Sequence, residues 1–179
     1  MTADKAAEVL LRGGVIAYPT EGVFGLGCLP QDTDAVRRVL DIKQREWSKG
    51  LILIGAHASQ FDDWIELPDA TVLPAPDPTC PTTWIVPASD KVAAVVRGDN
   101  EGLAIRITTN PVASAICRAV DSPIVSTSAN LSGQPIAADE EALRAQFTDL
   151  VDYVVPGACG PASRPSAIRE LLSGKILRS

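Results

Sequence analysis

A dense group of hydroxyl and amide side chains follows an apolar run in the segment SPIVSTSANLSG, residues 122–133. The group consists of Ser126, Thr127, Ser128, Asn130 and Ser132. Such a group can supply a nucleophilic serine, donors that cradle an anion, or only side chains that satisfy the backbone of a turn. A serine nucleophile needs a base nearby, but the only histidine, His57, lies in a separate strand-to-helix connection and the chain has no GxSxG motif. The segment therefore leaves an anion cradle and a plain turn as open alternatives.

Three cationic side chains lie between a predicted helix and a predicted strand in the stretch KQREWSKG: Lys43, Arg45 and Lys49. Cations stabilise the carboxyl end of a helix, so the stretch is typical of a solvated helix end. The same three charges beside a strand terminus could clamp a triphosphate. The chain contains no GxxxxGK[ST] motif, which excludes a P-loop. Both interpretations of the three cations stay open.

Two further stretches combine polar residues with strand ends. In AYPTEGVFGLG, Thr20 and Glu21 follow a strand that Pro19 ends, and the glycines allow a tight backbone path, as in an ordinary glycine-rich turn. In AIRIT, Arg106 lies inside an apolar strand, where a charge is costly unless it is paired. This predicts either an internal ion pair or a ligand for a carboxylate or phosphate at a pocket wall.

The elements that must position these side chains alternate between helical and strand periodicity. Helices are predicted over 4–12, 33–44, 59–65, 111–120 and 140–147. Strands are predicted over 15–19, 51–55, 82–88, 103–108, 123–128 and 152–157, with a hairpin over 167–178 and a glycine-rich loop over 20–28. Residues 66–81 contain five prolines and are predicted to form a surface loop. The alternation indicates an α/β layered domain in which parallel and antiparallel strand pairs are mixed.

The composition limits the class of protein. A chain of 179 residues with 46% hydrophobic residues predicts one domain over residues 1–179. The net charge of −6 argues against tight nucleic-acid binding by the whole surface. The four cysteines form no CxxC pair and are expected to be reduced and mostly buried thiols, with no zinc site. No signal peptide and no membrane-spanning run is evident, so we expect a cytoplasmic protein.

Five motifs follow one another along the chain: YPTEGVFGLG, KQR…KGLILI, LAIRIT, PIVSTSANLSG and VVPG…PSAIRELLSGKILR. In order and spacing they resemble the YrdC-like (TsaC) threonylcarbamoyl-AMP synthases of the Sua5/YciO/YrdC type, from about Leu11 to Arg178. The resemblance implies an α/β fold, a single-domain twisted open mixed sheet flanked by helices, with a concave, positively charged cleft. With the other motifs alongside it, the serine-rich segment is better interpreted as an anion cradle than as a plain turn.

The resemblance implies that the protein makes L-threonylcarbamoyladenylate and pyrophosphate from L-threonine, bicarbonate and ATP, with Mg²⁺ bound to the ATP and no metal held by the protein. Other proteins would use the product for N6-threonylcarbamoyladenosine modification of ANN-decoding tRNAs. Threonine's amine and bicarbonate form a carbamate that attacks the α-phosphorus, so no protein nucleophile is needed. The absence of a catalytic histidine or cysteine is then expected.

The resemblance also assigns roles to individual side chains. Catalysis would fall to Lys43 and Arg45. Threonine and bicarbonate would be bound by Thr20, Arg106, Thr108, Ser126 and Ser166. ATP would be bound by Lys43, Arg45, Lys49, Ser128, Asn130 and Arg178.

The chain departs from the motifs of its relatives at several positions. Glu46 replaces a common proline beside the cations, PTCP (78–81) replaces WPGP, and PSA (165–167) replaces PST. Two alternatives remain: an RNA-binding or ribosome-assembly module of the same fold, and a carbamoyl-adenylate-forming domain that acts on another acceptor. The acidic composition argues against the first and leaves direct tRNA binding open, whereas the second type usually lies within a longer chain.

Overall fold

The chain folds around one open sheet in which parallel and antiparallel pairs are mixed. The computed structural model describes residues 2–131, 133–162 and 164–179. These residues form nine strands in the order β7-β1-β2-β6-β3-β5-β4-β8-β9. The strands are β1 Ile16–Tyr18, β2 Gly25–Gly27, β3 Ile52–Gly55, β4 Thr82–Pro87, β5 Gly102–Ile107, β6 Ile124–Ser128, β7 Tyr153–Val154, β8 Ala167–Glu170 and β9 Ile176–Arg178. The pairs β1–β7, β3–β5 and β4–β8 are parallel, and the others are antiparallel.

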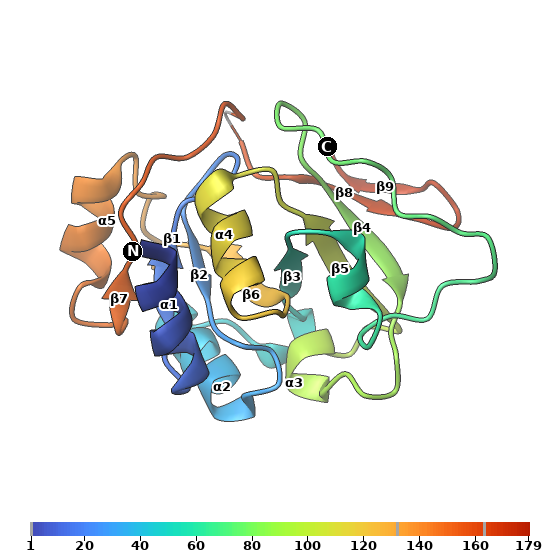
Figure 1. Cartoon of the computed structure of the whole chain (residues 1–179), viewed down its shortest axis with the longest axis horizontal. Coiled ribbons are helices and arrows are strands. Elements are labelled where there is room, and N and C mark those ends of the chain that lie inside the picture. The colour runs from blue at the N-terminus through green and yellow to red at the C-terminus, as the bar shows by residue number, and fades with distance from the viewer. Residues whose placement is uncertain (1, 132, 163) are drawn as a thin grey trace.

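Helices cover both faces of the sheet. Helices α1 (Thr2–Leu11) and α4 (Pro111–Ala119) lie side by side on one face, as Figure 1 shows. Helices α2 (Thr33–Lys43), α3 (Ala94–Arg97) and α5 (Glu140–Phe147) contribute to the core on the other face. The predicted α/β class, with an open mixed sheet flanked by helices, is therefore confirmed.

Two apolar clusters fill the space between the helices and the sheet. Along β1, Ile16 and Tyr18 pack with α1 and α4, whereas Ala17 packs with the cluster on the opposite face. Leu53 and Ile54 of β3 divide in the same way. This alternation follows from the two-residue period of a strand, which turns successive side chains to opposite faces. A strand with both faces buried therefore appears in the sequence as a continuous apolar run.

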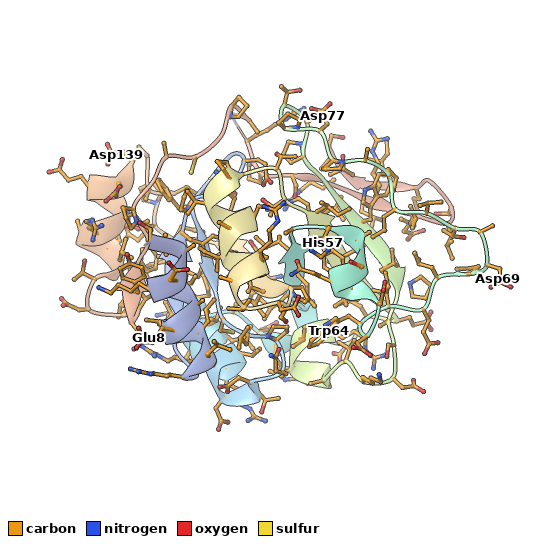
Figure 2. The ribbon with its side chains drawn as sticks, viewed as in Figure 1. Glu8, His57, Trp64, Asp69, Asp77 and Asp139 are labelled. Atoms are coloured by element: carbon orange, nitrogen blue, oxygen red, sulfur yellow. The ribbon has the colours of Figure 1, made fainter. Side chains whose placement is uncertain are left out.

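Several predicted elements are found where the sequence indicated. Helix α5 has the predicted bounds, residues 140–147, and the hairpin of β8 and β9 turns at Ser173 and Gly174. The proline-rich residues 66–81 contain no helix or strand, as predicted. This loop runs along the edge of the molecule, and Asp69 and Asp77 mark its course in Figure 2.

Two predicted elements are wrong. The helix expected over 59–65 is only a short 3-10 helix, Ala58–Phe61. The side chain of Gln60 bonds the backbone N–H of Ala56 and the carbonyl oxygen of Cys117. Ile65 forms a β-bridge with Ala88, so the chain is extended there and not helical. The glycine-rich loop expected over 20–28 contains the central strand β2. Two short elements, the 3-10 helix Trp47–Lys49 and helix α3, were not predicted at all.

The glycines of β2 permit close packing rather than a turn. A Cβ atom at Gly27 would lie 2.3 Å from the carbonyl oxygen of Val125 and 2.8 Å from Cε1 of Tyr18. Both neighbours are buried, and the hydroxyl of Tyr18 donates to that same carbonyl at 3.2 Å. Strand β2 can therefore lie between β1 and β6 only with glycine at this position.

We expect Gly27→Ala to lower the free energy of unfolding by about 2 kcal/mol or more, because neither contacting group can move away. Gly174→Ala is the matched control: it has a φ of 72° but nothing within 4 Å of its Cβ, so its cost should be limited to about 1 kcal/mol of backbone strain. Urea unfolding of both variants measures the difference. Equal losses would contradict the packing argument.

Candidate functional site

A large cavity lies where several connections and strand ends meet. Its volume is about 860 Å³, and it is bordered by the β1–β2 connection, the segment after α2, strands β4 to β6 and the β8–β9 hairpin. The cations that line it are Arg45, Lys49, Arg97, Arg106, Arg164 and Arg178, and the carboxylates are Glu21, Glu101 and Glu170. The lining is therefore net positive, although the whole chain carries a net charge of −6.

Most of the side chains predicted to bind substrates line this one cavity. They are Thr20, Arg45, Lys49, Arg106, Ser126, Ser128, Ser166 and Arg178. Three predicted residues, Lys43, Thr108 and Asn130, do not line it. Each of these three is hydrogen-bonded to a lining residue, so they form a layer directly behind the wall.

The end of β6 is held in place from beneath by a lysine. Nζ of Lys43 donates to the backbone oxygen of Asn130 at 2.6 Å and to its Oδ1 at 2.7 Å. Oγ of Ser128 donates to the same Oδ1 at 2.8 Å. Desolvation, with the Arg45 charge added to it, lowers the pKa of Lys43 to about 8. Lys43 therefore fixes the conformation of residues 128–130. Ser132, which belongs to the same motif, lies outside the described residues.

The segment after α2 folds back on itself through an arginine. Nε and Nη2 of Arg45 donate to the carbonyl oxygen of Gly50 at 3.3 and 2.9 Å. Desolvation lowers the pKa of Arg45 below its ordinary value. Glu46, the acidic departure in this motif, is exposed and is not part of the cavity wall. The fold thus brings Arg45 and Lys49 to the wall while Glu46 points elsewhere.

A buried carboxylate connects the β1–β2 connection to β5. Oε1 of Glu21 accepts hydrogen bonds from Oγ1 of Thr108 at 2.5 Å and from the backbone N–H of Thr109 at 2.7 Å. Its Oε2 lies 3.4 Å from Nη2 of Arg106, so the internal ion pair, one of the two alternatives for that arginine, is present. Desolvation alone would raise the pKa of Glu21, but the Arg106 charge and the hydrogen bonds outweigh it and lower the pKa. Glu21 is therefore an ionised group in the interior.

The C-terminal hairpin closes the remaining side of the cavity. Oγ of Ser166 and Oγ1 of Thr83 share a buried hydrogen bond of 2.7 Å between β4 and the residue before β8. Nη2 and Nε of Arg178 donate to the carbonyl oxygen of Ser166 at 2.6 and 3.1 Å. These bonds hold Arg178, from the last strand, at the cavity that Arg106 also lines, and desolvation together with the Arg106 charge lowers the pKa of Arg178.

The sequence analysis assigned no role to three polar residues that organise this site: Glu21, Thr83 and Asn110. Asn110 caps α4 through its Oδ1 and donates from Nδ2 to the carbonyl oxygen of Thr20 at 3.0 Å. The asparagine before Pro111 was a visible helix-cap signal, and Glu21 was the nearest acid to the predicted strand exit. Thr83 gave no signal, because a threonine within a strand is unremarkable.

Other kinds of site find little support in the described residues. No group of three or more His, Cys, Asp and Glu side chains among them is placed to hold a metal ion. Nδ1 of His57 lies 2.9 Å from Oγ of Ser59, and His57 is not part of the cavity.

All four cysteines are free, but only Cys28 and Cys117 are fully buried, so the expectation of mostly buried thiols holds for half of them. Within the described ranges, no helix is long and apolar enough to cross a membrane.

Comparison with known proteins identifies the family of this chain. A family model described as telomere recombination, covering Sua5, YciO and YrdC proteins, matches residues 8–179. This chain belongs to the Sua5/YciO/YrdC family. A protein named threonylcarbamoyl-AMP synthase from Stenotrophomonas maltophilia (strain K279a) is 44% identical, over 100% of this chain and 98% of that protein. A protein of the same name from Xanthomonas campestris pv. campestris (strain B100) is 43% identical, over 98% of this chain and 96% of that protein.

A solved member of the Sua5/YciO/YrdC family has the same architecture. The crystal structure of P. abyssi Sua5 complexed with L-threonine matches with a TM-score of 0.80 and 25% sequence identity. The match covers 97% of this chain and 52% of that chain, so this chain spans about half the length of P. abyssi Sua5.

The lowered pKa of Lys43 gives this family member a testable pH dependence. The folded-state pKa of about 8 lies below the ordinary 10.5, so between these values the unfolded chain holds the proton more tightly than the folded chain. The free energy of unfolding of the wild type, relative to Lys43→Met, should therefore rise from pH 8 to pH 10.5. The neutral amine keeps two N–H donors for Asn130, so the loss of charge need not break the contacts.

Urea unfolding of both proteins at pH 7.5 and 9.5 measures this difference. Taking the difference between the two proteins removes the contribution of other groups that titrate in the same window, such as the buried thiols. The same difference at both pH values would show that Lys43 is not desolvated as the structure indicates.

Proposed function

We propose that this chain is a threonylcarbamoyl-AMP synthase, which forms L-threonylcarbamoyladenylate and pyrophosphate from L-threonine, bicarbonate and ATP. The single observation that carries this proposal is the net-positive cavity of about 860 Å³, in which hydroxyl and cationic side chains converge on an otherwise acidic chain. Relatives with the same name, 43 and 44% identical over almost the whole chain, support it. We take this cavity to be the concave, positively charged cleft that the family resemblance implies.

The reaction requires placement of anions more than a reactive side chain. The threonine nitrogen forms a bond to the carbon of bicarbonate, and water leaves. A carbamate oxygen then bonds to the α-phosphorus of ATP while the bond from that phosphorus to the bridging oxygen breaks and pyrophosphate departs. Negative charge gathers on the leaving group, so fixed cations and donors supply the stabilisation. A cavity lined by arginines, one lysine and serines has the groups for this work.

We assign two groups of side chains in the cavity to different substrates. Thr20, Ser126, Ser166 and Arg106 would contact threonine and bicarbonate, with Thr108 holding Glu21 behind them. The triphosphate would lie against Arg45, Lys49, Ser128 and Arg178. Lys43 and Asn130, which lie behind the wall, would act by fixing Ser128 and the backbone around it.

The Mg²⁺ in this proposal arrives with the nucleotide. Since the described residues hold no cluster of acidic, histidine or cysteine ligands, the ion would be coordinated by the triphosphate oxygens and water. There it would neutralise part of the charge that develops on pyrophosphate.

The product would pass to other proteins that modify ANN-decoding tRNAs, and we expect this activity in the cytoplasm, where free thiols persist. The net charge of −6 does not favour a direct role in binding tRNA phosphates. It also disfavours the alternative of an RNA-binding module.

The deciding experiment is a pyrophosphate-release assay with purified protein, ATP, Mg²⁺ and bicarbonate. We expect release to depend on L-threonine, because the carbamate of the amino acid is the attacking group. Equal rates with serine, with alanine and with no amino acid would reject the threonine assignment.

Two substitutions test the side chains assigned to the nucleotide. Arg45→Ala should weaken ATP binding by about tenfold to a hundredfold, because charge-assisted hydrogen bonds to phosphate contribute about 1.5–3 kcal/mol. Asn130→Ala should weaken it by a smaller factor, since Asn130 acts through the loop. Calorimetry of ATP binding measures both effects.

Arg37→Ala provides the control, because Arg37 is an exposed cation of α2 that pairs with Asp34 and does not line the cavity. Its ATP affinity should equal that of the wild type. If Arg45→Ala and Asn130→Ala were folded and also bound ATP normally, the nucleotide would have to lie elsewhere.

A further inference from the structure

The cations that line the cavity differ in whether a carboxylate neutralises them. Arg106 has one, because Oε2 of Glu21 lies 3.4 Å from its Nη2. Among the ion pairs of the described residues, none joins a carboxylate to the other lining cations, Arg45, Lys49, Arg97, Arg164 and Arg178. One arginine of the cavity is therefore electrically compensated and five cations are not.

The side chain of Glu21 is buried and held in place by hydrogen bonds. Its side chain is 2% exposed, and its Oε1 is bound by Thr108 and by the backbone N–H groups of Thr109 and Asn110. These donors come from the connection between β5 and α4, which Asn110 anchors to the β1–β2 connection. The carboxylate cannot turn toward solvent without breaking all of these bonds, so the compensation of Arg106 is built into the fold.

Arg106 nevertheless keeps unused hydrogen-bonding capacity. Its Nε is buried without a hydrogen-bond partner in the described part of the chain, and the contact to Glu21 at 3.4 Å is an ion pair rather than a close hydrogen bond. A guanidinium has five N–H donors in a planar fork that matches a carboxylate. Compensated in charge but unsatisfied in hydrogen bonds, Arg106 suits a singly charged, planar ligand better than a polyphosphate.

The need for such compensation follows from the position of Arg178. This uncompensated cation is held by the carbonyl oxygen of Ser166 and lines the same cavity as Arg106. Without Glu21, the two arginines would form a strongly positive pair, and a polyphosphate would bind across both of them.

We propose that Glu21 is a positioning residue that reserves Arg106 for the α-carboxylate of the amino-acid substrate and thereby confines the triphosphate to the five uncompensated cations. This inference rests on the proposed function. Glu21 itself would not touch either substrate; it would act through the charge and orientation of Arg106.

The experiment measures binding of L-threonine by calorimetry, with and without saturating inorganic pyrophosphate as the probe. In the wild type the dissociation constant for threonine should change by less than about twofold, because the two anions use different cations. In Glu21→Gln, pyrophosphate should compete with threonine and raise its apparent dissociation constant by about tenfold, which corresponds to about 1.4 kcal/mol. Competition in the wild type, or its absence in folded Glu21→Gln, would overturn the proposal.

Two further variants separate charge from structure. Glu21→Asp retains the negative charge and should restore independent binding. Gln60→Leu removes another buried polar group, whose side chain bonds the backbone N–H of Ala56 and the carbonyl oxygen of Cys117, away from the cavity. It should lower stability without producing competition. Competition in Gln60→Leu as well would mean that any loosening of the core has this effect, which would also overturn the proposal.

These measurements also distinguish the inference from the function on which it rests. A wild type that does not bind threonine under any condition would reject the proposed function. If the wild type binds threonine, the effect of pyrophosphate alone decides the role of Glu21. Should Glu21→Gln fail to fold, the wild type and Glu21→Asp still give a decisive answer, since competition in either one contradicts the proposal.

Discussion

The buried carboxylate of Glu21 is the interaction on which the site depends most. It joins the β1–β2 connection to the region between strand β5 and α4, whose hydrogen-bond donors to Glu21 lie 87 to 89 residues away in the sequence. An ionised group is buried only when charges and donors replace its water, and removing one partner from such a pair typically costs about 3–5 kcal/mol. The close approach of these two parts of the chain and the ionisation of Glu21 therefore depend on each other.

The cavity also illustrates how a local field can oppose the overall charge of a chain. The net charge of −6 would repel a polyanion at long range, but screening reduces that effect beyond about 8–10 Å in physiological salt. Inside the cavity, the arginines held by backbone carbonyls keep their donors close to a ligand. Arg45 is held by Gly50 and Arg178 by Ser166, so neither loses its charge to a carboxylate. Backbone carbonyls orient these cations without neutralising them.

Much of the fold could be predicted because it depends on local patterns. The bounds of α5 and the turn of the β8–β9 hairpin follow from side-chain periodicity and a Ser-Gly pair. Strand β2 could not be predicted in this way, because Gly25 and Gly27 are explained by the close approach of β1 and β6, which adjacent residues do not reveal. The helix expected over 59–65 failed for a similar reason, since a distant partner, Ala88, draws Ile65 out of helical geometry.

The same distinction applies to the site. Motifs indicate which side chains converge, but not which of them face the cavity. In the sequence, nothing separates Lys43, Thr108 and Asn130 from lining residues such as Arg45 and Ser128. In the structure, the polar atoms of these three residues form hydrogen bonds to other protein groups behind the cavity wall. Which side chains face the cavity depends on how far each strand extends before the chain turns, and Lys43 and Thr108 bond partners 87 residues away in the sequence. Residues behind the cavity wall are therefore as specific to this fold as the residues that face the cavity. A sequence motif that contains both kinds describes how the whole wall is built, and not only which side chains contact a ligand.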